Sequence, residues 1–336
     1  MIDFANEPDY HGVNFILRNK MKRPITLVCL IAIVFVSGCS HTGYLTPFTP
    51  STIPATSIFV STPFTSITSI TTTTLPSTTQ PNAIQSGLLD VHFIDVGEGD
   101  SILIDYGTTD ILIDGGQYAG IVNSIKPYIH GDIEAIIATH PHADHIGGLT
   151  SVLESFKVDN VFWTGETATT QTFTDWKKAM DASGAKETIV KRGDVINEGG
   201  LTLNVLDPTK TTDSDVDLDC IVTSLQFGSQ SFLFMGDDGQ PAEDNLISSG
   251  LLQHFDVLKI GHHGSDTASS QEFVDIVKPE YAIYECGLND SYGFPKADII
   301  ARWQTSGAAI YGTDINGTVT YESNGVTATI TSAKSP

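Results

Sequence analysis

Residues 87–336 of this 336-residue sequence predict a mixed α/β domain in which two β-sheets pack together with helices on the outside. Short apolar runs separated by Gly, Asp and Asn are typical of strands joined by tight turns. Three such runs open this region, and later runs alternate twice with helical stretches. Because 40% of all residues are hydrophobic, the chain can form a sizeable core and is not disordered throughout.

Each expected element rests on a local pattern of apolar residues and turn residues. The first strands are expected at 88–95, 101–106 and 110–114, with tight turns at 97–99 and 107–110. A helix at 118–129, a buried strand at 134–139, a helix at 147–156, a strand at 158–163 and a helix at 174–183 follow. Next come strands at 201–206, 221–227 and 231–235. The remainder alternates, with helices at 241–249, 271–277 and 296–305 and strands at 255–260, 281–286, 308–311, 317–322 and 326–331.

The N-terminal segment has the pattern of a bacterial targeting signal. A basic cluster at 20–23 precedes an apolar run from Ile25 to Val36, which is too short for a bilayer span of about 20 residues. The run ends in Val36-Ser37-Gly38-Cys39, which resembles the lipobox of bacterial lipoproteins. We therefore expect residues 1–38 to be an upstream extension plus a lipoprotein signal peptide, and Cys39 to carry lipid. An ordinary signal peptide or a longer membrane anchor is the alternative.

Residues 39–86 are expected to form a lipid-anchored, disordered tether. Ser, Thr and Pro make up 28 of the 47 residues from 40 to 86, and Asp, Glu, Lys and Arg are absent from this range. Such a segment has little apolar surface to offset the entropy of ordering it. The tether would hold the domain at 87–336 away from the extracellular face of the bacterial cell membrane.

The negative charge belongs to the domain. The whole chain has a net charge of −23, and residues 87–336 carry 13 basic and 37 acidic residues, which gives −24. This balance argues against a basic surface that binds nucleic acid. The domain's two cysteines, Cys220 and Cys286, lie in apolar runs, where buried free thiols are favoured over a disulfide. We expect a monomer without a protein partner.

The strongest chemical signal is a run of histidine and aspartate directly after the buried strand at 134–139. It contains His140, His142, Asp144 and His145, all residue types that bind zinc and similar ions. In a loop, His140 and His142, the first and third residues of the run, can face one point. Asp144 and His145, the fifth and sixth residues, can face a second point. The run therefore predicts two divalent metal ions side by side, zinc or manganese. A solvated loop is the alternative, but His-x-His-x-Asp-His at a strand end is a rare pattern.

This run resembles the His-x-His-x-Asp-His signature of the metallo-β-lactamase superfamily, and other motifs follow in the same order. Phe93–Ser101 resembles the opening of the ComEC-like hydrolase domains of DNA-uptake proteins, where Gln is usual in place of Glu98. Ile111–Gly116 is similar to the superfamily's first motif, and Ser231–Asp237 is similar to its Gly-Asp motif. Asp256–Ser265 resembles the His-His-Gly-Ser motif of the ComEC-like branch.

The resemblance covers nearly all of residues 87–325 and implies an αββα sandwich with a dinuclear metal site on one edge. It implies that one metal is held by His140, His142 and one histidine of the pair His262 and His263. Asp144 and His145 would hold the second metal, and Asp237 would bridge the two. Of the adjacent pair, we favour His262 as the ligand, with His263 supporting the site or contacting substrate.

Further residues are candidates for supporting roles. The resemblance implies that Asp114 orients a ligand histidine without binding metal itself. Asp95 and Asp100 flank a glycine turn, so each has either an indirect role at the site or a turn-forming role. Asn289 and Tyr292 are candidates for substrate contact.

Other histidines are expected to have no ligand role, and one expected histidine is missing. His92, His130 and His254 are not expected to bind metal. The family often has Tyr-Gly-His-Pro where this chain has Phe294 in the third position, so the second metal would lose a ligand if that histidine binds it. The usual superfamily histidine before the Gly-Asp motif is also absent, and the His-His-Gly-Ser motif would compensate for it.

The resemblance implies a metal-dependent hydrolase, in which Asp144 and Asp237 are the carboxylates closest to the chemistry. Because the ComEC-like branch is associated with nuclease activity, a phosphodiester, including DNA, is the expected substrate. A hydrolase of a smaller substrate (a phosphocholine or teichoic-acid ester, a lactone or a β-lactam) and a weakened surface binding module are the alternatives. The acidic surface would repel a polyanion unless four basic residues gather near the cleft: Lys177, Lys178, Lys191 and Arg192.

Overall fold

The computed structural model describes residues 87–210 and 220–335. The expected signal segment, the expected lipidation site Cys39 and the expected tether lie outside the described residues. Among the helices that are described, none combines the length and the apolar character that a bilayer span requires. Cys220 and Cys286 are both buried and are not joined by a disulfide, as their apolar surroundings predict.

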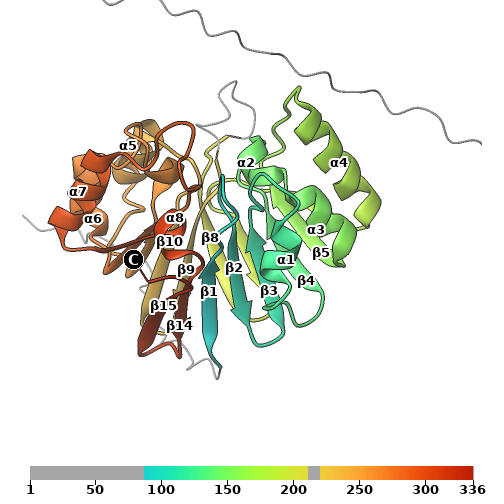
Figure 1. Cartoon of the computed structure of the whole chain (residues 1–336), viewed down its shortest axis with the longest axis horizontal. Coiled ribbons are helices and arrows are strands. Elements are labelled where there is room, and N and C mark those ends of the chain that lie inside the picture. Colours follow the sequence, from blue (N-terminus) through green and yellow to red (C-terminus); the bar gives the residue numbers. More distant parts are fainter. Residues whose placement is uncertain (1–86, 211–219, 336) are drawn as a thin grey trace, which may run out of the picture. The chain divides into compact units, whose positions relative to one another are not determined.

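Two mixed sheets pack face to face in the described region (Figure 1). The first sheet has the strand order β15-β14-β1-β2-β3-β4-β5-β6, with β1 (Leu89–Phe93), β2 (Ile102–Tyr106), β3 (Thr109–Ile113), β4 (Ile133–Ile137), β5 (Val158–Trp163), β6 (Lys186–Ile189), β14 (Val319–Ser323) and β15 (Ala328–Ser332). The second has the order β13-β12-β11-β10-β9-β8-β7, with β7 (Val195–Glu198), β8 (Leu201–Asp207), β9 (Val222–Phe227), β10 (Gln230–Phe234), β11 (Val257–Lys259), β12 (Tyr281–Tyr284) and β13 (Ala309–Gly312).

Helices cover the outer face of each sheet, which confirms the predicted αββα sandwich (Figure 1). The first sheet is covered by α1 (Ile121–Ile125), α2 (Ala143–Ile146), α3 (Leu149–Ser155) and α4 (Gln171–Ser183). The second is covered by α5 (Gln240–Ser248), α6 (Gln271–Val277) and α7 (Ala297–Ser306). A separate apolar core, which includes Phe93, Phe227 and Phe232, fills the space between the two sheets. Each sheet is thus buried on both faces over its central strands.

The sequence pattern missed elements that bury few apolar side chains. The edge strands β6 and β7 were not expected, because most of their side chains are exposed and show no apolar alternation. The single helix expected at 147–156 is preceded by a separate short helix, α2, and α8 (Thr313–Asn316) was also missed. The expected helix at 118–129 is shorter, since α1 covers only Ile121–Ile125.

The topology brings several chain segments together at one edge of the sandwich. Strands β3, β4 and β5 are parallel to one another, as are β10, β11 and β12. Carboxyl ends of parallel strands meet at a common edge, where loops collect. The segments that follow β4, β10 and β11 carry the histidine and aspartate motifs, so residues more than 100 positions apart become neighbours there.

A row of carboxylates crosses the outer face of the first sheet, away from these loops. Asp90 lies opposite Glu322 on β14 and opposite Asp105 on β2, and Asp105 lies opposite Asp110 on β3. Like charges directly opposite each other destabilise a sheet. Burial and the neighbouring carboxylates raise the pKa of Asp90 and of Asp110 to about 6, which shows the cost of ionising this row.

Replacing Asp110 with asparagine should stabilise the metal-free protein at neutral pH. The pKa of Asp110 is higher in the folded state, so the carboxyl favours folding at low pH, and this contribution is lost as the pH rises from about 4 to about 6. We expect Asp110→Asn to raise the free energy of unfolding by about 1 kcal/mol at pH 7.5, after allowance for solvent screening, and to change it little at pH 4. Urea unfolding at both pH values measures this, and an equal change at both would contradict it.

Candidate metal centre

The local backbone explains why the histidine run can face two points. His140 and His142 are separated by one residue on an extended segment after β4, and His142 caps the N-terminus of α2 with an extended backbone (φ −76°, ψ 152°). Asp144 and His145 fall in the single turn of α2 and therefore project in another direction. The two pairs thus leave the backbone at different angles although they lie within six residues.

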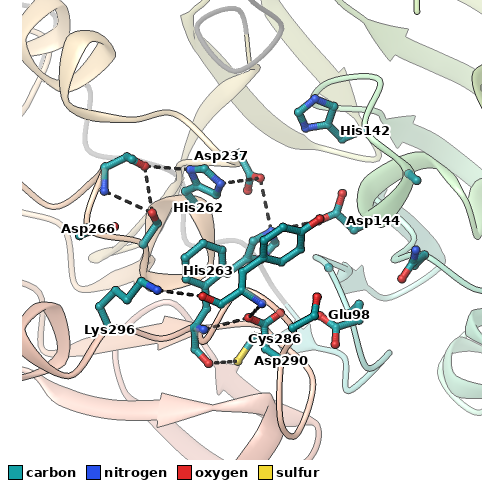
Figure 2. Close-up of a pocket in the computed structure, with 18 residues that line it drawn as sticks. Glu98, His142, Asp144, Asp237, His262, His263, Asp266, Cys286, Asp290 and Lys296 are labelled. Atoms are coloured by element: carbon teal, nitrogen blue, oxygen red, sulfur yellow. Dashed lines mark hydrogen bonds and ion pairs between the residues drawn. The ribbon is translucent and has the colours of Figure 1, made fainter. Parts of the chain in front are cut away.

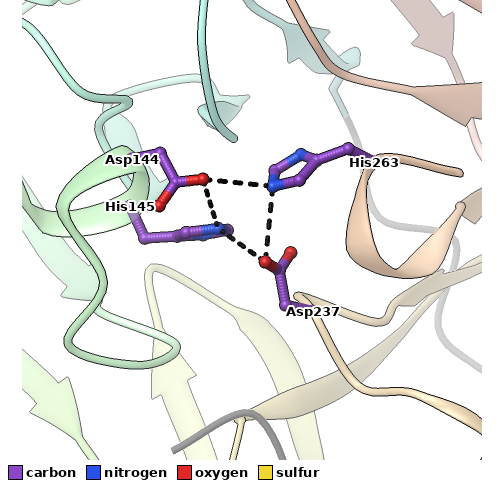
Figure 3. A group of neighbouring side chains, drawn as sticks. All are labelled: Asp144, His145, Asp237 and His263. Atoms are coloured by element: carbon purple, nitrogen blue, oxygen red, sulfur yellow. Dashed lines mark ion pairs between the residues drawn. The ribbon is translucent and has the colours of Figure 1, made fainter. Parts of the chain in front are cut away.

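Asp237 lies where two groups of donor atoms meet. One donor atom from each of Asp144, His145, Asp237 and His263 lies within 4.8 Å of the others. Figure 3 shows how these four side chains point toward one another. A second group satisfying the same limit consists of His140, His142 and Asp237. The Oδ2 atom of Asp237 is 3.2 Å from His145 Nε2, 3.3 Å from His263 Nε2 and 3.8 Å from His140 Nε2. A carboxylate shared by two donor groups is placed to bridge two cations.

The adjacent histidines play different parts from those expected. His263 is buried and its Nε2 lies 3.4 Å from Asp144 Oδ2, so it joins the group that contains Asp144. His262 is partly exposed, its Nε2 is 4.0 Å from Asp237 Oδ2, and its Nδ1 is 3.0 Å from Thr267 Oγ1. The preference for His262 as the ligand, and the assignment of the pair to the His140 group, are therefore corrected in favour of His263 beside Asp144.

Backbone strain sets the two histidine directions. Both residues have left-handed conformations, with φ 48° at His262 and φ 54° at His263, between Gly261 and Gly264. A non-glycine residue in this region costs of order 1–3 kcal/mol, and such strain is concentrated at functional sites. Sequence spacing carries no signal of this backbone conformation.

Asp114 holds two of the imidazole rings in position. Its Oδ2 accepts hydrogen bonds from His145 Nδ1 (2.8 Å) and from the hydroxyl of Thr139 (2.6 Å). Because that hydroxyl donates to Asp114, it can accept from His140 Nδ1, which lies 3.1 Å away. Both rings therefore carry their proton on Nδ1 and turn the Nε2 lone pair toward the donor groups.

Asp100 and Lys259 support His263 in the same way. Asp100 Oδ1 is 3.0 Å from His263 Nδ1, which also donates to the backbone oxygen of Glu285 at 2.8 Å. The other oxygen of Asp100 forms an ion pair with Lys259, whose side chain is fully buried. The role of Lys259 was not predicted from the sequence. Its only sequence signal is a basic residue in the mainly apolar run Asp256–Ile260.

A glycine allows the loop that carries Asp100 to approach the metal loop. A Cβ at Gly99, where φ is +96°, would lie 1.7 Å from the backbone oxygen of Asp144. Any side chain at this position would separate the two loops, which explains a glycine in this turn.

Two residues that the sequence suggested for the site, Asp95 and Asn289, lie outside the donor groups. The carboxylate of Asp95 is 2.9 Å from Lys334 Nζ and accepts from the backbone N–H of Gly97, so of the two roles considered for it Asp95 has the turn-forming one and does not support the site. The glycine turn reverses the chain after Asp95 and brings Asp100 to His263 instead. Asn289 is exposed, has a left-handed φ of 63° typical of a turn, and does not line the cavity described below.

The donor atoms fit divalent metal ions. The Nε2 atoms of His140, His145 and His263 and the Oδ1 of Asp237 are buried and have no hydrogen-bond partner. Imidazole nitrogens and carboxylate oxygens left in this state are the ligand set of zinc and related metals. Orphaned polar atoms are otherwise rare in a protein interior.

These groups open into a cavity of about 670 Å³ (Figure 2). The carboxylates that line it are Glu98, Asp144, Asp237, Asp266 and Asp290, and Lys296 is the one lysine or arginine among the lining residues. The four basic residues considered from the sequence do not line it: Lys177, Lys178, Lys191 and Arg192. Burial and a hydrogen bond that the Glu98 carboxyl donates to the Asp290 carboxylate raise the pKa of Glu98 to about 7.

An aromatic stack forms one side of this cavity. The ring of Phe294 lies 6.2 Å from that of His263 at an interplanar angle of 28°, and the ring of Tyr292 stacks on Phe294 at 5.8 Å and 18°. The Nζ of Lys296 is 4.9 Å from the centre of the Phe294 ring. Tyr292 is 72% exposed and lines the cavity, so a flat aromatic side chain remains open beside the donor groups.

Comparison with known proteins identifies relatives over about two thirds of the chain. The family model "Metallo-beta-lactamase superfamily" matches residues 91–287. The chain is 27% identical to ComE operon protein 3 of Bacillus subtilis over 253 residues, which is 69% of this chain and 33% of that protein. It is 26% identical to Competence protein ComA of Neisseria gonorrhoeae over 232 residues, 68% of this chain and 31% of that protein. The chain thus spans about a third of the length of these curated relatives.

Among solved structures, one similar fold is that of YhfI from Bacillus subtilis, a metallo-beta-lactamase fold protein. The match covers 70% of this chain and 100% of YhfI, with 12% sequence identity and a TM-score of 0.49.

Proposed function

The chain belongs to the metallo-β-lactamase superfamily of hydrolases, and from this premise we propose that it is a metal-dependent phosphodiesterase that cleaves DNA. The observation that carries the proposal is the position of Asp237 Oδ2 between two groups of buried donor atoms at the wall of a cavity of about 670 Å³. In keeping with the lipobox-like sequence at Cys39, we place this activity at the extracellular face of the bacterial membrane.

The candidate ligands form two sets, one for each metal position. His140, His142 and Asp237 would hold one divalent ion, and Asp144, His145, His263 and Asp237 would hold the other. Two such ions supply hydroxide at neutral pH and positive charge opposite the charge that develops on a phosphodiester. Asp114 and Asp100 keep the Nδ1 protons of His145 and His263 in place, so that the Nε2 lone pairs stay available. His262, which lines the cavity beside Asp237, is positioned to contact the substrate.

A single-stranded DNA substrate is supported by the names of the relatives and by the aromatic stack. The names of ComE operon protein 3 and Competence protein ComA point to competence, and the motifs of this chain resemble those of ComEC-like hydrolase domains of DNA-uptake proteins. Exposed aromatic rings stack on the bases of single strands, and this contact is independent of charge. Because the cavity wall is acidic, we expect Tyr292 to contribute more to binding than Coulomb attraction does, and binding to depend only weakly on salt.

The acidic cavity also favours a second candidate, a hydrolase of small phosphodiesters that carry a cationic group, such as phosphocholine esters. Carboxylates and an exposed tyrosine together attract quaternary ammonium groups. The complete donor groups argue against the third reading, a binding module that has lost its chemistry, although Phe294 offers no nitrogen where the family often has histidine.

Hydrolysis assays with the purified chain separate these functions. With manganese or zinc we expect cleavage of single-stranded DNA and of bis-p-nitrophenyl phosphate, and loss of both activities in His142→Ala. If DNA stays intact while the small diester or p-nitrophenylphosphorylcholine is cleaved, the nuclease proposal fails. Unchanged activity in His142→Ala would remove the metal mechanism, and a chain that binds no metal would support the binding module.

A further inference from the structure

We propose that Asp90, His92 and Asp105 form a third divalent metal site, on the outer face of the first sheet and separate from the candidate metal centre. One donor atom from each of these three residues lies within 4.8 Å of the other two. This site is independent of the proposed hydrolase function, since none of its residues belongs to the donor groups around Asp237 or lines the cavity beside them.

Strand pairing creates this arrangement. Asp90 and His92 are two positions apart on β1, so their side chains project from the same face of the sheet. Asp105 on β2 is directly opposite Asp90. His92 is not expected as a ligand from the sequence, because Asp105 reaches it only through the pairing of the two strands.

His92 has the geometry of a metal-binding histidine. Its side chain is 4% exposed, and its ring stacks on that of Tyr128 at 4.0 Å, which fixes the ring orientation. Its Nδ1 is 2.8 Å from the hydroxyl of Thr320, while its Nε2 is buried and has no hydrogen-bond partner. Metal-bound histidines commonly donate one ring N–H to such a partner and present the other nitrogen to the ion.

The negative charge of the carboxylates around His92 favours binding of a cation. Asp90 is opposite both Glu322 and Asp105, and one of its carboxylate oxygens is buried without a hydrogen-bond partner. Within the described residues, the basic side chain that the structure pairs with this row is His130, whose Nδ1 is 3.7 Å from Asp105 Oδ2 and whose side chain is 62% exposed.

The donor set points to a metal that accepts nitrogen. One imidazole and two carboxylates suit zinc or manganese, whereas calcium and magnesium prefer oxygen ligands throughout. Asp90 and Asp105 are only partly buried, so water can reach the site and complete the coordination. A bound ion would neutralise the like charges that face each other across β1 and β2, and would join these two strands.

The number of zinc ions bound per chain tests the site. The purified chain is dialysed against buffered zinc, and zinc is measured by mass spectrometry. We expect three ions in the wild type and two in His92→Leu, with hydrolysis of bis-p-nitrophenyl phosphate retained as a sign that the fold and the other two sites are intact. His254→Leu is the matched control, because His254 also lies beside one aspartate, with Nε2 3.5 Å from Asp256 Oδ1, and should keep three.

A second variant covers the case in which His92→Leu does not fold. Asp105→Asn keeps the shape of the side chain but removes a ligand charge, and we expect zinc at this site to bind at least about tenfold more weakly. If His92→Leu and Asp105→Asn bind as many zinc ions as the wild type, the third site is excluded, whatever number the candidate metal centre binds. If the wild type hydrolyses no substrate, the proposed function fails. The difference in bound zinc between the wild type and the variants still tests the third site.

Discussion

Replacing Asp237 with alanine should abolish hydrolysis, with a loss in kcat/KM on the order of 10³-fold or more. The Oδ2 of this residue lies 3.2 Å from His145 Nε2 and 3.3 Å from His263 Nε2, and Asp237 is a member of both donor groups. No other residue of the two groups is shared, so a single substitution removes a ligand from both metal positions. The remaining histidine nitrogens would face each other with Asp144 as the one carboxylate left in the two groups.

Metal content and kinetics together check this expectation. Asp237→Ala should bind fewer of the two hydrolytic metal ions and should cleave neither DNA nor bis-p-nitrophenyl phosphate. Asp244→Ala is the control, because Asp244 is an exposed aspartate on α5 and should retain both metals and full activity. If Asp237→Ala kept both ions and a tenth or more of the activity, Asp237 would not be the bridge.

Replacing Lys259 with methionine should destabilise the protein by about 3–5 kcal/mol, because it leaves the charge of Asp100 buried and unpaired. Lys259 is fully buried at the end of β11 and forms its ion pair with Asp100 from the loop between β1 and β2. Burial opposes ionisation of Asp100, but Lys259 and His263 hold the pKa of Asp100 below its usual value. Burial and the charge of Asp100 raise the pKa of the neighbouring Glu285 well above its usual value, so Asp100 is the charged member of this pair of acids.

The same substitution should weaken metal binding beside His263. Without Lys259, Asp100 is no longer held against His263 Nδ1, at 3.0 Å, and the ring loses part of its orientation. Urea unfolding gives the change in stability, and zinc titration gives the change in affinity. The double variant Lys259→Met/Asp100→Asn should recover much of the lost stability, because it removes the unpaired charge as well.

An exposed lysine with similar partners provides the matched control. Lys157 lies 2.5 Å from Asp132 and 2.8 Å from Asp159, but its side chain is 65% exposed. Ion pairs in water contribute little to stability, so Lys157→Met should unfold at nearly the same urea concentration as the wild type. If Lys259→Met unfolded like Lys157→Met, the buried pair would not be important for stability.

Much of the site could be predicted because its first part is local in sequence. His140, His142, Asp144 and His145 fall within six residues, and their side-chain directions follow from a short extended segment and the start of one helix turn. The apolar runs also predicted most strands and two packed sheets with helices outside, since burial on one or both faces leaves a pattern in the sequence, and the family resemblance implied the αββα sandwich. Edge strands such as β6 bury little and left no such pattern.

The residues that were misjudged depend on contacts between distant segments. The choice of His263 over His262 follows from two left-handed backbone positions, which the order of side chains does not reveal. Of the two aspartates that flank the glycine turn, Asp100 supports the site and Asp95 does not, because the direction of the chain after the turn decides which carboxylate returns to the site.

The sequence by itself therefore determined the class of fold and predicted the candidate metal ligands of one loop, because periodicity and close spacing are local properties. Only the tertiary structure decided which distant side chains complete the site. Lys259 reaches Asp100 across 159 positions, and Asp105 reaches Asp90 only through strand pairing. The energies that select these partners, burial of charge and its neutralisation by a neighbour, arise only when the chain has folded and excluded water.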